Sequence, residues 1–181
     1  MNRRVVFNIL GRMLMVESAL LLLPLFVSAL YKERCFWSFL ITAAIALILG
    51  LFIKLVSKPR KNTIYAKEGF VIVALVWISI SLVGALPFKI SGEIPNFFDA
   101  FFETVSGFTT TGASVLNDVE HLSHGILFWR SFTHWVGGMG ILVFVMAIIP
   151  NLSDRTIHIM RAEMPGPVVD KIVRRVKQTA K

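Results

Sequence analysis

The sequence predicts an all-α membrane protein, and three observations carry that prediction. The chain has 181 residues, of which 55% are hydrophobic, and its mean hydropathy is +0.71, more apolar than a soluble domain of this size. Residues 35–53 and 69–88 contain no charge, 13–31 contains only Glu17, and 126–150 contains only Arg130 and His134. Each of these four stretches can cover about 30 Å of hydrocarbon as a helix. A further apolar segment, 96–108, is too short to cross a bilayer.

Residues 1–60 are expected to form two N-terminal transmembrane helices. Three arginines precede the first apolar stretch, as in a signal peptide, but no small-residue cleavage site follows it. We therefore expect a retained helix. Glu17 is costly inside an apolar helix, so it should either face a partner or lie near the membrane edge, and we favour the membrane edge.

Residues 61–150 are expected to contain one pore repeat. Its predicted parts are an outer helix over 68–90, a re-entrant pore helix over 96–108, a filter over 109–113 and an inner helix over 126–150. Pro95 and Gly107 supply plausible boundaries for the short helix. A half-crossing helix with an extended return strand survives in a membrane only where it lines a watery cavity or is buried in protein.

The five residues after the short helix have the composition of a potassium filter: Thr109, Thr110, Thr111, Gly112 and Ala113. A filter needs extended backbone whose carbonyls point at one axis, where rings of them replace the water around an ion. Glycine supplies the backbone freedom for that conformation.

The net charge of +8 is explained by membrane orientation and not by nucleic acid. Lysine and arginine are concentrated before the first helix, between the second and third, and after the fourth, which predicts that both termini are cytoplasmic. Residues 90–129 contain no lysine or arginine but five acidic residues: Glu93, Asp99, Glu103, Asp118 and Glu120. They form either an acidic outer vestibule that concentrates cations or solvated loop charges. Residues 151–181 form a basic linker with a short amphipathic helix, which lies on anionic lipid or docks a partner.

Several residues near the filter leave alternatives open. Glu103 lies within the short helix and is expected to brace the filter loop more than to contact an ion. Arg130 either pairs with an acidic group such as Glu103 or extends to the outer surface. Three glycines, Gly137, Gly138 and Gly140, allow close helix packing or act as a hinge or gate.

Catalysis and resident metals are not expected. No nucleophile–base pair, phosphate-binding loop or metal-ligand spacing is present in the sequence, so we expect neither an enzyme nor an organic cofactor. The single cysteine, Cys35, excludes an internal disulfide. His121 and His124 with nearby carboxylates leave a membrane enzyme as a minor alternative.

Three long strings resemble one family. Residues 101–114, FFETVSGFTTTGAS, resemble the first pore loop of the Trk/Ktr/HKT potassium transporters, and 128–140, FWRSFTHWVGGMG, resemble the start of the inner helix after it. Residues 161–167, RAEMPGP, resemble the linker to the next repeat. The resemblance covers nearly the whole chain and is closest to TrkH-type membrane subunits.

The resemblance implies a pore of four such repeats with two additional helices in front. Thr110, Thr111 and Gly112 would match the filter positions, with Thr109 and Ala113 flanking them. Gly112, where sodium-favouring members have serine, implies potassium as the transported ion. The implied partners are the lipid bilayer of the plasma (inner) membrane and a cytosolic, nucleotide-binding, TrkA-like regulatory subunit.

The expected function is therefore potassium uptake, with symport of sodium or protons left open. One repeat gives one of four filter segments, so we expect a truncated part whose remaining pore repeats, or a second transporter subunit, complete the pore. A homotetrameric cation channel and a non-transporting membrane interaction fragment are the alternatives.

Overall fold

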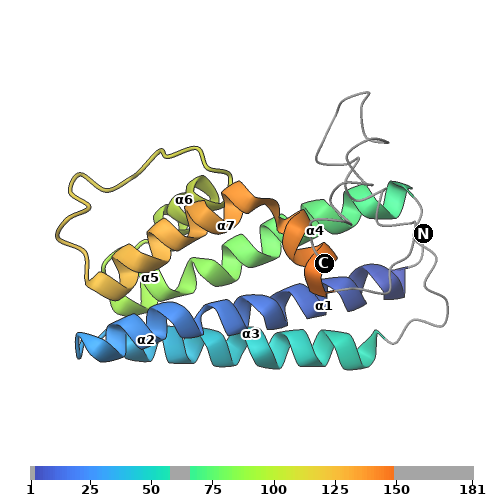
Figure 1. The fold of residues 1–181 in the computed structure, drawn as a ribbon, viewed down its shortest axis with the longest axis horizontal. Helices are drawn as coiled ribbons and strands as arrows, with labels where there is room; N and C mark the ends of the chain where they lie inside the picture. The colour runs from blue at the N-terminus through green and yellow to red at the C-terminus, as the bar shows by residue number, and fades with distance from the viewer. Residues whose placement is uncertain (1–2, 58–65, 149–181) are drawn as a thin grey trace.

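A computed structural model describes residues 3–57 and 66–148 of the chain (Figure 1). Its elements are all helices: α1 (Arg3–Leu20), α2 (Leu22–Leu30), α3 (Phe36–Val56), α4 (Ala66–Gly84), α5 (Leu86–Ser91), α6 (Phe97–Phe108) and α7 (His124–Ile148). The predicted all-helical class is confirmed for this part of the chain. The predicted linker and tail, 151–181, and most of the basic loop before α4 lie outside the described residues.

Three segments among the described residues are long and apolar enough to cross a membrane: Arg3–Leu30, Phe36–Val56 and Val71–Ser91. Prolines bend two of them. Pro24 and Pro87 have no N–H to donate to the carbonyls of Leu20 and Val83, and the helices are interrupted at Leu21 and Ala85. The predicted outer helix over 68–90 is therefore two helices, α4 and α5.

The other predicted elements differ slightly in their bounds. The short helix over 96–108 begins at Phe97, because Asn96 has extended backbone and caps it. The inner helix begins at His124, two residues before the predicted start, and Gly140 interrupts it with φ 71° and ψ 132°. A helix cannot continue through that conformation, so α7 changes direction there.

The first and third helices pack backbone to backbone. A Cβ added to Gly11 would lie 2.7 Å from the carbonyl oxygen of Gly50, and a Cβ on Gly50 would lie as close to that of Gly11. Ser18 Oγ donates to the carbonyl oxygen of Ala43 at 2.8 Å. Small residues and a buried hydroxyl are the usual means by which membrane helices approach closely. Figure 1 shows α1 and α3 running side by side over most of their length, with α4 above them.

Glu17 is a correction to the sequence prediction, because it lies inside the protein and not at the membrane edge. Only 4% of its surface is exposed, and it falls in the middle of the Arg3–Leu30 span. It follows the buried residues Val6, Leu10 and Met13 at helical spacing, which places it on the face of α1 that packs against other helices.

Two carboxylates join the loops at one end of the helices. Glu33, between α2 and α3, accepts hydrogen bonds from the backbone N–H groups of His124 at 2.8 Å and Gly125 at 3.0 Å. It therefore caps the first turn of α7 from another part of the chain. Glu93, after α5, accepts from the N–H and the hydroxyl of Ser123. The chain thus leaves this end after Glu93, forms α6 and the loop after it, and returns to the same end at Ser123.

The cap predicts a pH-dependent stability. Burial raises the pKa of Glu33, but hydrogen bonds from the Gly125 N–H, the His124 ring and N–H, and Cys35 outweigh it, so the pKa lies below its ordinary value of 4.5. A lowered pKa stabilises the fold above the unfolded-state pKa, and this contribution is lost as the pH falls through the folded-state pKa. At pH 7, Glu33→Gln should lower the free energy of unfolding by about 1 kcal/mol, as for other helix caps.

Thermal unfolding of the purified protein in detergent between pH 7 and pH 3 would measure this effect. The difference between wild type and Glu33→Gln should shrink as the pH falls below 4.5. Asp118→Asn is the matched control, because Asp118 pairs with a histidine in an exposed position and should contribute little. Equal effects of the two substitutions at pH 7 would contradict the cap.

Candidate functional site

The candidate site begins with α6, whose sequence explains both its start and its orientation. Asn96 Oδ1 accepts from the Phe98 N–H at 3.0 Å, and Asp99 adds a negative charge to the first turn. Ala100, Glu103, Thr104 and Gly107 are buried at helical spacing. With 12 residues, α6 is about 18 Å long, and its last turn lies deep among the other helices.

Its C-terminus is a Schellman motif that contains a threonine where glycine is usual. The Thr111 N–H donates to the Ser106 carbonyl and the Thr110 N–H to the Gly107 carbonyl, each at 2.9 Å. Thr110 takes the left-handed position with φ 55°. A β-branched residue is strained there, by about 1–2 kcal/mol. Such strain concentrates at functional positions.

The return segment after α6 is exposed and follows a specific path. Residues 109–115 are all exposed in this chain. Gly112 has φ 77°, and a Cβ added to it would meet nothing within 4 Å, so conformation and not space favours glycine there. Ser106 Oγ donates to the Ala113 carbonyl at 2.5 Å, which turns this oxygen toward α6. Thr109 Oγ1 and Thr111 Oγ1 lie 2.8 Å apart.

One buried carboxylate joins this segment to both helices. Glu103 on α6 is 1% exposed. It accepts from Ser114 Oγ at 3.0 Å, from the Val115 N–H at 3.1 Å and from Arg130 Nε at 2.6 Å. A buried carboxylate is stable when its oxygens are paired and hydrogen-bonded in this way. Of the two alternatives for Arg130, the structure contains the ion pair.

Two neighbours of Arg130 complete the contact between α6 and α7. His134 Nδ1 lies 2.9 Å from the Arg130 carbonyl oxygen, and Thr133 Oγ1 donates to the same carbonyl at 2.7 Å. Thr133 is also the side chain that a Cβ on Gly107 would strike. His134 is thus a hydrogen-bonded packing residue.

The three glycines of α7 have different surroundings. A Cβ on Gly137 would collide with the backbone of Phe108, so this glycine lets α7 touch the end of α6. A Cβ on Gly138 would meet only Thr110 Cγ2, at 3.9 Å. Gly140 is the site of the helix interruption.

The acidic and histidine residues of the outer loops are spread over separate pairs. Glu93 is bonded to Ser123, Asp118 to His121 and Glu33 to His124. Asp118 and Glu120 are exposed, whereas Glu103 is engaged inside the protein. Within residues 3–57 and 66–148 no three of the metal-ligating side chains gather.

Sequence reasoning missed three residues that hold the site together. Ser106 and Ser114 fix the return segment. Trp129 is 1% exposed, and its Nε1 donates to the Gly84 carbonyl at 2.9 Å, joining α7 to α4. The two serines could have been noticed as small hydroxyl residues that flank the filter sequence within an apolar region.

Comparison with known proteins gives one consistent result. The family described as TrkH, cation transport protein, matches residues 37–181. The Trk system potassium uptake protein TrkH of Salmonella typhimurium is 41% identical over 100% of this chain and 38% of its own length. TrkG of Escherichia coli is 35% identical over 98% of this chain and 37% of its own length.

A solved structure agrees. The potassium transporter TrkH from Vibrio parahaemolyticus matches with a TM-score of 0.75 at 33% identity, over 99% of this chain and 37% of that one. The resemblance predicted from the three sequence strings is confirmed. The chain spans about 38% of the length of the first curated relatives it matches.

The carboxylate pairing predicts strong coupling between Glu103 and Arg130. Removing one partner of a buried ion pair leaves an uncompensated charge, and costs about 3–5 kcal/mol. Glu103→Gln and Arg130→Gln should each lower the unfolding temperature sharply, and the double substitution should cost less than the sum of the two. Thermal unfolding of all four proteins forms the double-mutant cycle. Additive losses would refute the pairing.

The adjacent glycines provide a matched test of packing. Gly137→Ala should lower the unfolding temperature, because its Cβ collides with the Phe108 backbone. Gly138→Ala should leave it unchanged or raise it, since alanine favours a helix by about 1 kcal/mol and open space surrounds it. The measurement is thermal unfolding in the same detergent, and a reversed order would contradict the close approach of α7 to α6.

Proposed function

The chain belongs to the TrkH family of cation transport proteins, and we propose that it supplies one wall of a pore for potassium uptake. The matching family is one of transporters and not of enzymes. We therefore set aside the alternative in which His121 and His124 carry out catalysis. The similar proteins of known name are Trk system potassium uptake proteins, and they motivate the choice of ion.

The observation that carries the proposal is the excursion between Glu93 and Ser123. The two residues are hydrogen-bonded to each other, so the intervening segment enters and leaves at one end of the helices. Its short helix ends at an exposed, irregular backbone stretch. Within a membrane, irregular backbone is tolerated where it lines a water-filled path. A re-entrant pore loop accounts for the short helix, the return and the exposure together.

In this proposal the ion is bound by main-chain oxygens. Thr110, Thr111 and Gly112 supply carbonyls to the ion path, and Thr109 and Ala113 flank them. The Thr110 hydroxyl donates to the Thr109 carbonyl at 2.7 Å, which leaves its oxygen lone pairs for an ion at the inner end. Dehydration at these oxygens is the whole mechanism, with no covalent step.

Glu103 and Arg130 have a supporting role in the proposal. They hold Ser114 and Val115, which follow the filter segment, against α6 and α7. Gly137 brings α7 against the end of α6, and Gly138 lies next to Thr110. Gly140 interrupts α7, and in this proposal Gly138 and Gly140 belong to a gate.

The remaining parts of the proposal concern topology and partners. Residues 1–60 form the two additional helices, 61–150 the pore repeat and 151–181 a cytoplasmic linker, with both termini on the cytoplasmic side of the plasma membrane. Ring closure around an ion requires further filter segments, from remaining pore repeats or a second transporter subunit. A cytosolic, nucleotide-binding, TrkA-like subunit would bind the basic cytoplasmic segments, which fall largely outside the described residues.

A selectivity measurement tests the proposal. Potassium-limited growth and rubidium uptake should be restored when transport-deficient cells carry the complete reading frame that includes this chain. Gly112→Ser should reduce the preference for potassium over sodium by about tenfold or more, because ring geometry sets the fit of the ion, and tenfold corresponds to about 1.4 kcal/mol.

Gly92→Ser is the matched control. Gly92 also has a positive φ, 84°, and a Cβ on it would also meet nothing within 4 Å, but it follows α5 outside the filter segment. Its replacement imposes the same backbone strain and should leave selectivity unchanged. If Gly112→Ser and Gly92→Ser altered selectivity equally, or not at all, Gly112 would have no role in the filter.

A further inference from the structure

Glu17 is a buried acid on α1. Both of its carboxylate oxygens lack a partner among the described residues, and only 4% of its surface is exposed. Glu103, the other buried carboxylate of this region, has at least three donors. Such an unpaired acid in an apolar interior calls for a ligand of its own.

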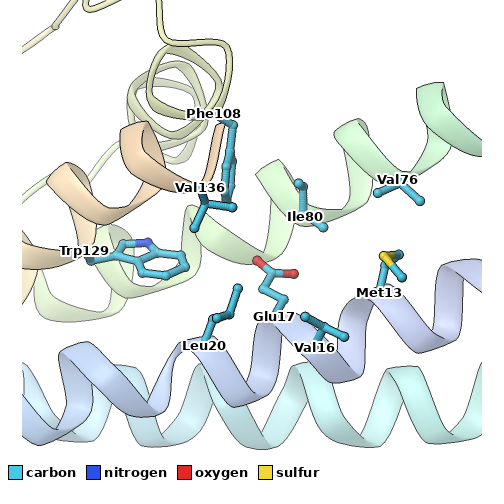
Figure 2. Close-up of a pocket in the computed structure, with 9 residues that line it drawn as sticks. All are labelled: Met13, Val16, Glu17, Leu20, Val76, Ile80, Phe108, Trp129 and Val136. Carbon is cyan, nitrogen blue, oxygen red and sulfur yellow. The ribbon is translucent and has the colours of Figure 1, made fainter. Parts of the chain in front are cut away.

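The carboxylate points into a cavity between α1, α4, α6 and α7 (Figure 2). The cavity has a volume of about 30 Å³ and is lined by Met13, Val16, Glu17, Leu20, Val76, Ile80, Phe108, Trp129 and Val136. Figure 2 shows the Glu17 oxygens directed away from α1 toward α4, with Trp129 to the left of them and Phe108 above. A water molecule needs about 10–15 Å³ of such space, so one or two fit beside the acid.

Within residues 3–57 and 66–148, the charged groups around the cavity offer no counter-ion. The nearest on α1 is Arg12, and α4 has none between Val71 and Gly84. On α6, Asp99 is in the first turn and Glu103 is engaged with Arg130 of α7. His134 of α7 lies against the Arg130 carbonyl, and the backbone carbonyl of Lys54 on α3 accepts from Asn8, nine residues before Glu17. None of these groups forms a hydrogen bond or an ion pair with Glu17.

The lining also argues against a metal cation. Potassium and similar ions require about six oxygen ligands, and Glu17 is the only acidic or amide side chain in the wall. The nearby Gly84 carbonyl already accepts from Trp129 Nε1, and Thr104 Oγ1 donates to Ala100. A proton needs only the carboxyl oxygen itself, and the resulting O–H can donate to water in the cavity.

We propose that Glu17 is an intramembrane proton-binding site, held as a neutral carboxylic acid that is hydrogen-bonded to water in this cavity. The site joins the first helix to the residues that precede the predicted filter, since Phe108 ends α6 immediately before Thr109. Loss of the proton places a charge against Phe108, Trp129 and Val136, and weakens this junction. The site does not depend on the pore assignment, because it consists of the junction itself.

Infrared difference spectra of wild type and Glu17→Gln, reconstituted in lipid nanodiscs at pH 7, test the protonation. The spectrum should contain the carbonyl stretch of a neutral carboxylic acid, and the band should shift in D₂O. Glu93→Gln is the control, because the half-buried loop carboxylate of Glu93 accepts two hydrogen bonds from Ser123 and should give carboxylate bands instead. Carboxylate bands from Glu17 would overturn the proposal.

A stability series supplies the second measurement. The unfolding temperature of wild type relative to Glu17→Gln should fall as the pH rises from 5 to 9, because the unfolded chain releases the proton more readily than the folded one. A constant difference would count against the site. So would a rise in the wild-type unfolding temperature with potassium or sodium that Glu17→Gln abolishes, since it would identify a bound cation in place of the proton.

Discussion

The buried carboxylate of Glu103 is the interaction on which the rest of the candidate site depends. It holds the return segment through Ser114 and Val115 and holds α7 through Arg130. Three consecutive segments of the chain, α6, the return segment and α7, therefore meet at one side chain. An acid buried in a membrane protein is costly unless it is fully hydrogen-bonded. Arrangements in which Glu103 loses these hydrogen bonds are therefore disfavoured, and the region is held in one arrangement. The exposed path of residues 109–113 is thus held at its far end by this anchor, and at its start by the hydrogen bonds that end α6.

Hydrogen bonds at the helix ends fix much of the remaining arrangement of the helices. Glu33 caps α7 from the loop between α2 and α3, and Glu93 fastens the loop before it. These contacts bring the N-terminal hairpin and the predicted pore repeat together at one end. At mid-depth, Trp129 joins α7 to α4 through the Gly84 carbonyl. Glu33 thus attaches the N-terminal hairpin to the repeat, whereas the bonds of Glu93 and Trp129 hold the repeat together internally.

The sequence was sufficient for the helices and the family, and insufficient for the contacts between helices. Charge-free stretches predict spans because their physical cause is local hydrophobicity, and the short Phe-rich segment is recognisable by length alone. Glu17 was misplaced because the free-energy cost of a charged side chain in the bilayer does not reveal which face of α1 packs against other helices. The breaks at Leu21 and Ala85 follow from Pro24 and Pro87, local signals that length counting overlooked. The close contact of Gly11 with Gly50 arises only when α1 and α3 pack together, so the sequence pattern of either helix alone does not predict it.

The left-handed conformation of Thr110 makes the end of α6 depend on contacts with other segments. Its left-handed conformation opposes the intrinsic preference of threonine, so the end of α6 is a place where local sequence and final structure disagree. The anchors that offset this cost come from Ser106 within α6 and from Arg130 through Glu103. The second of these exists only after α7 has docked. The conformation of the return segment therefore depends on the docking of α7 as well as on its own residues.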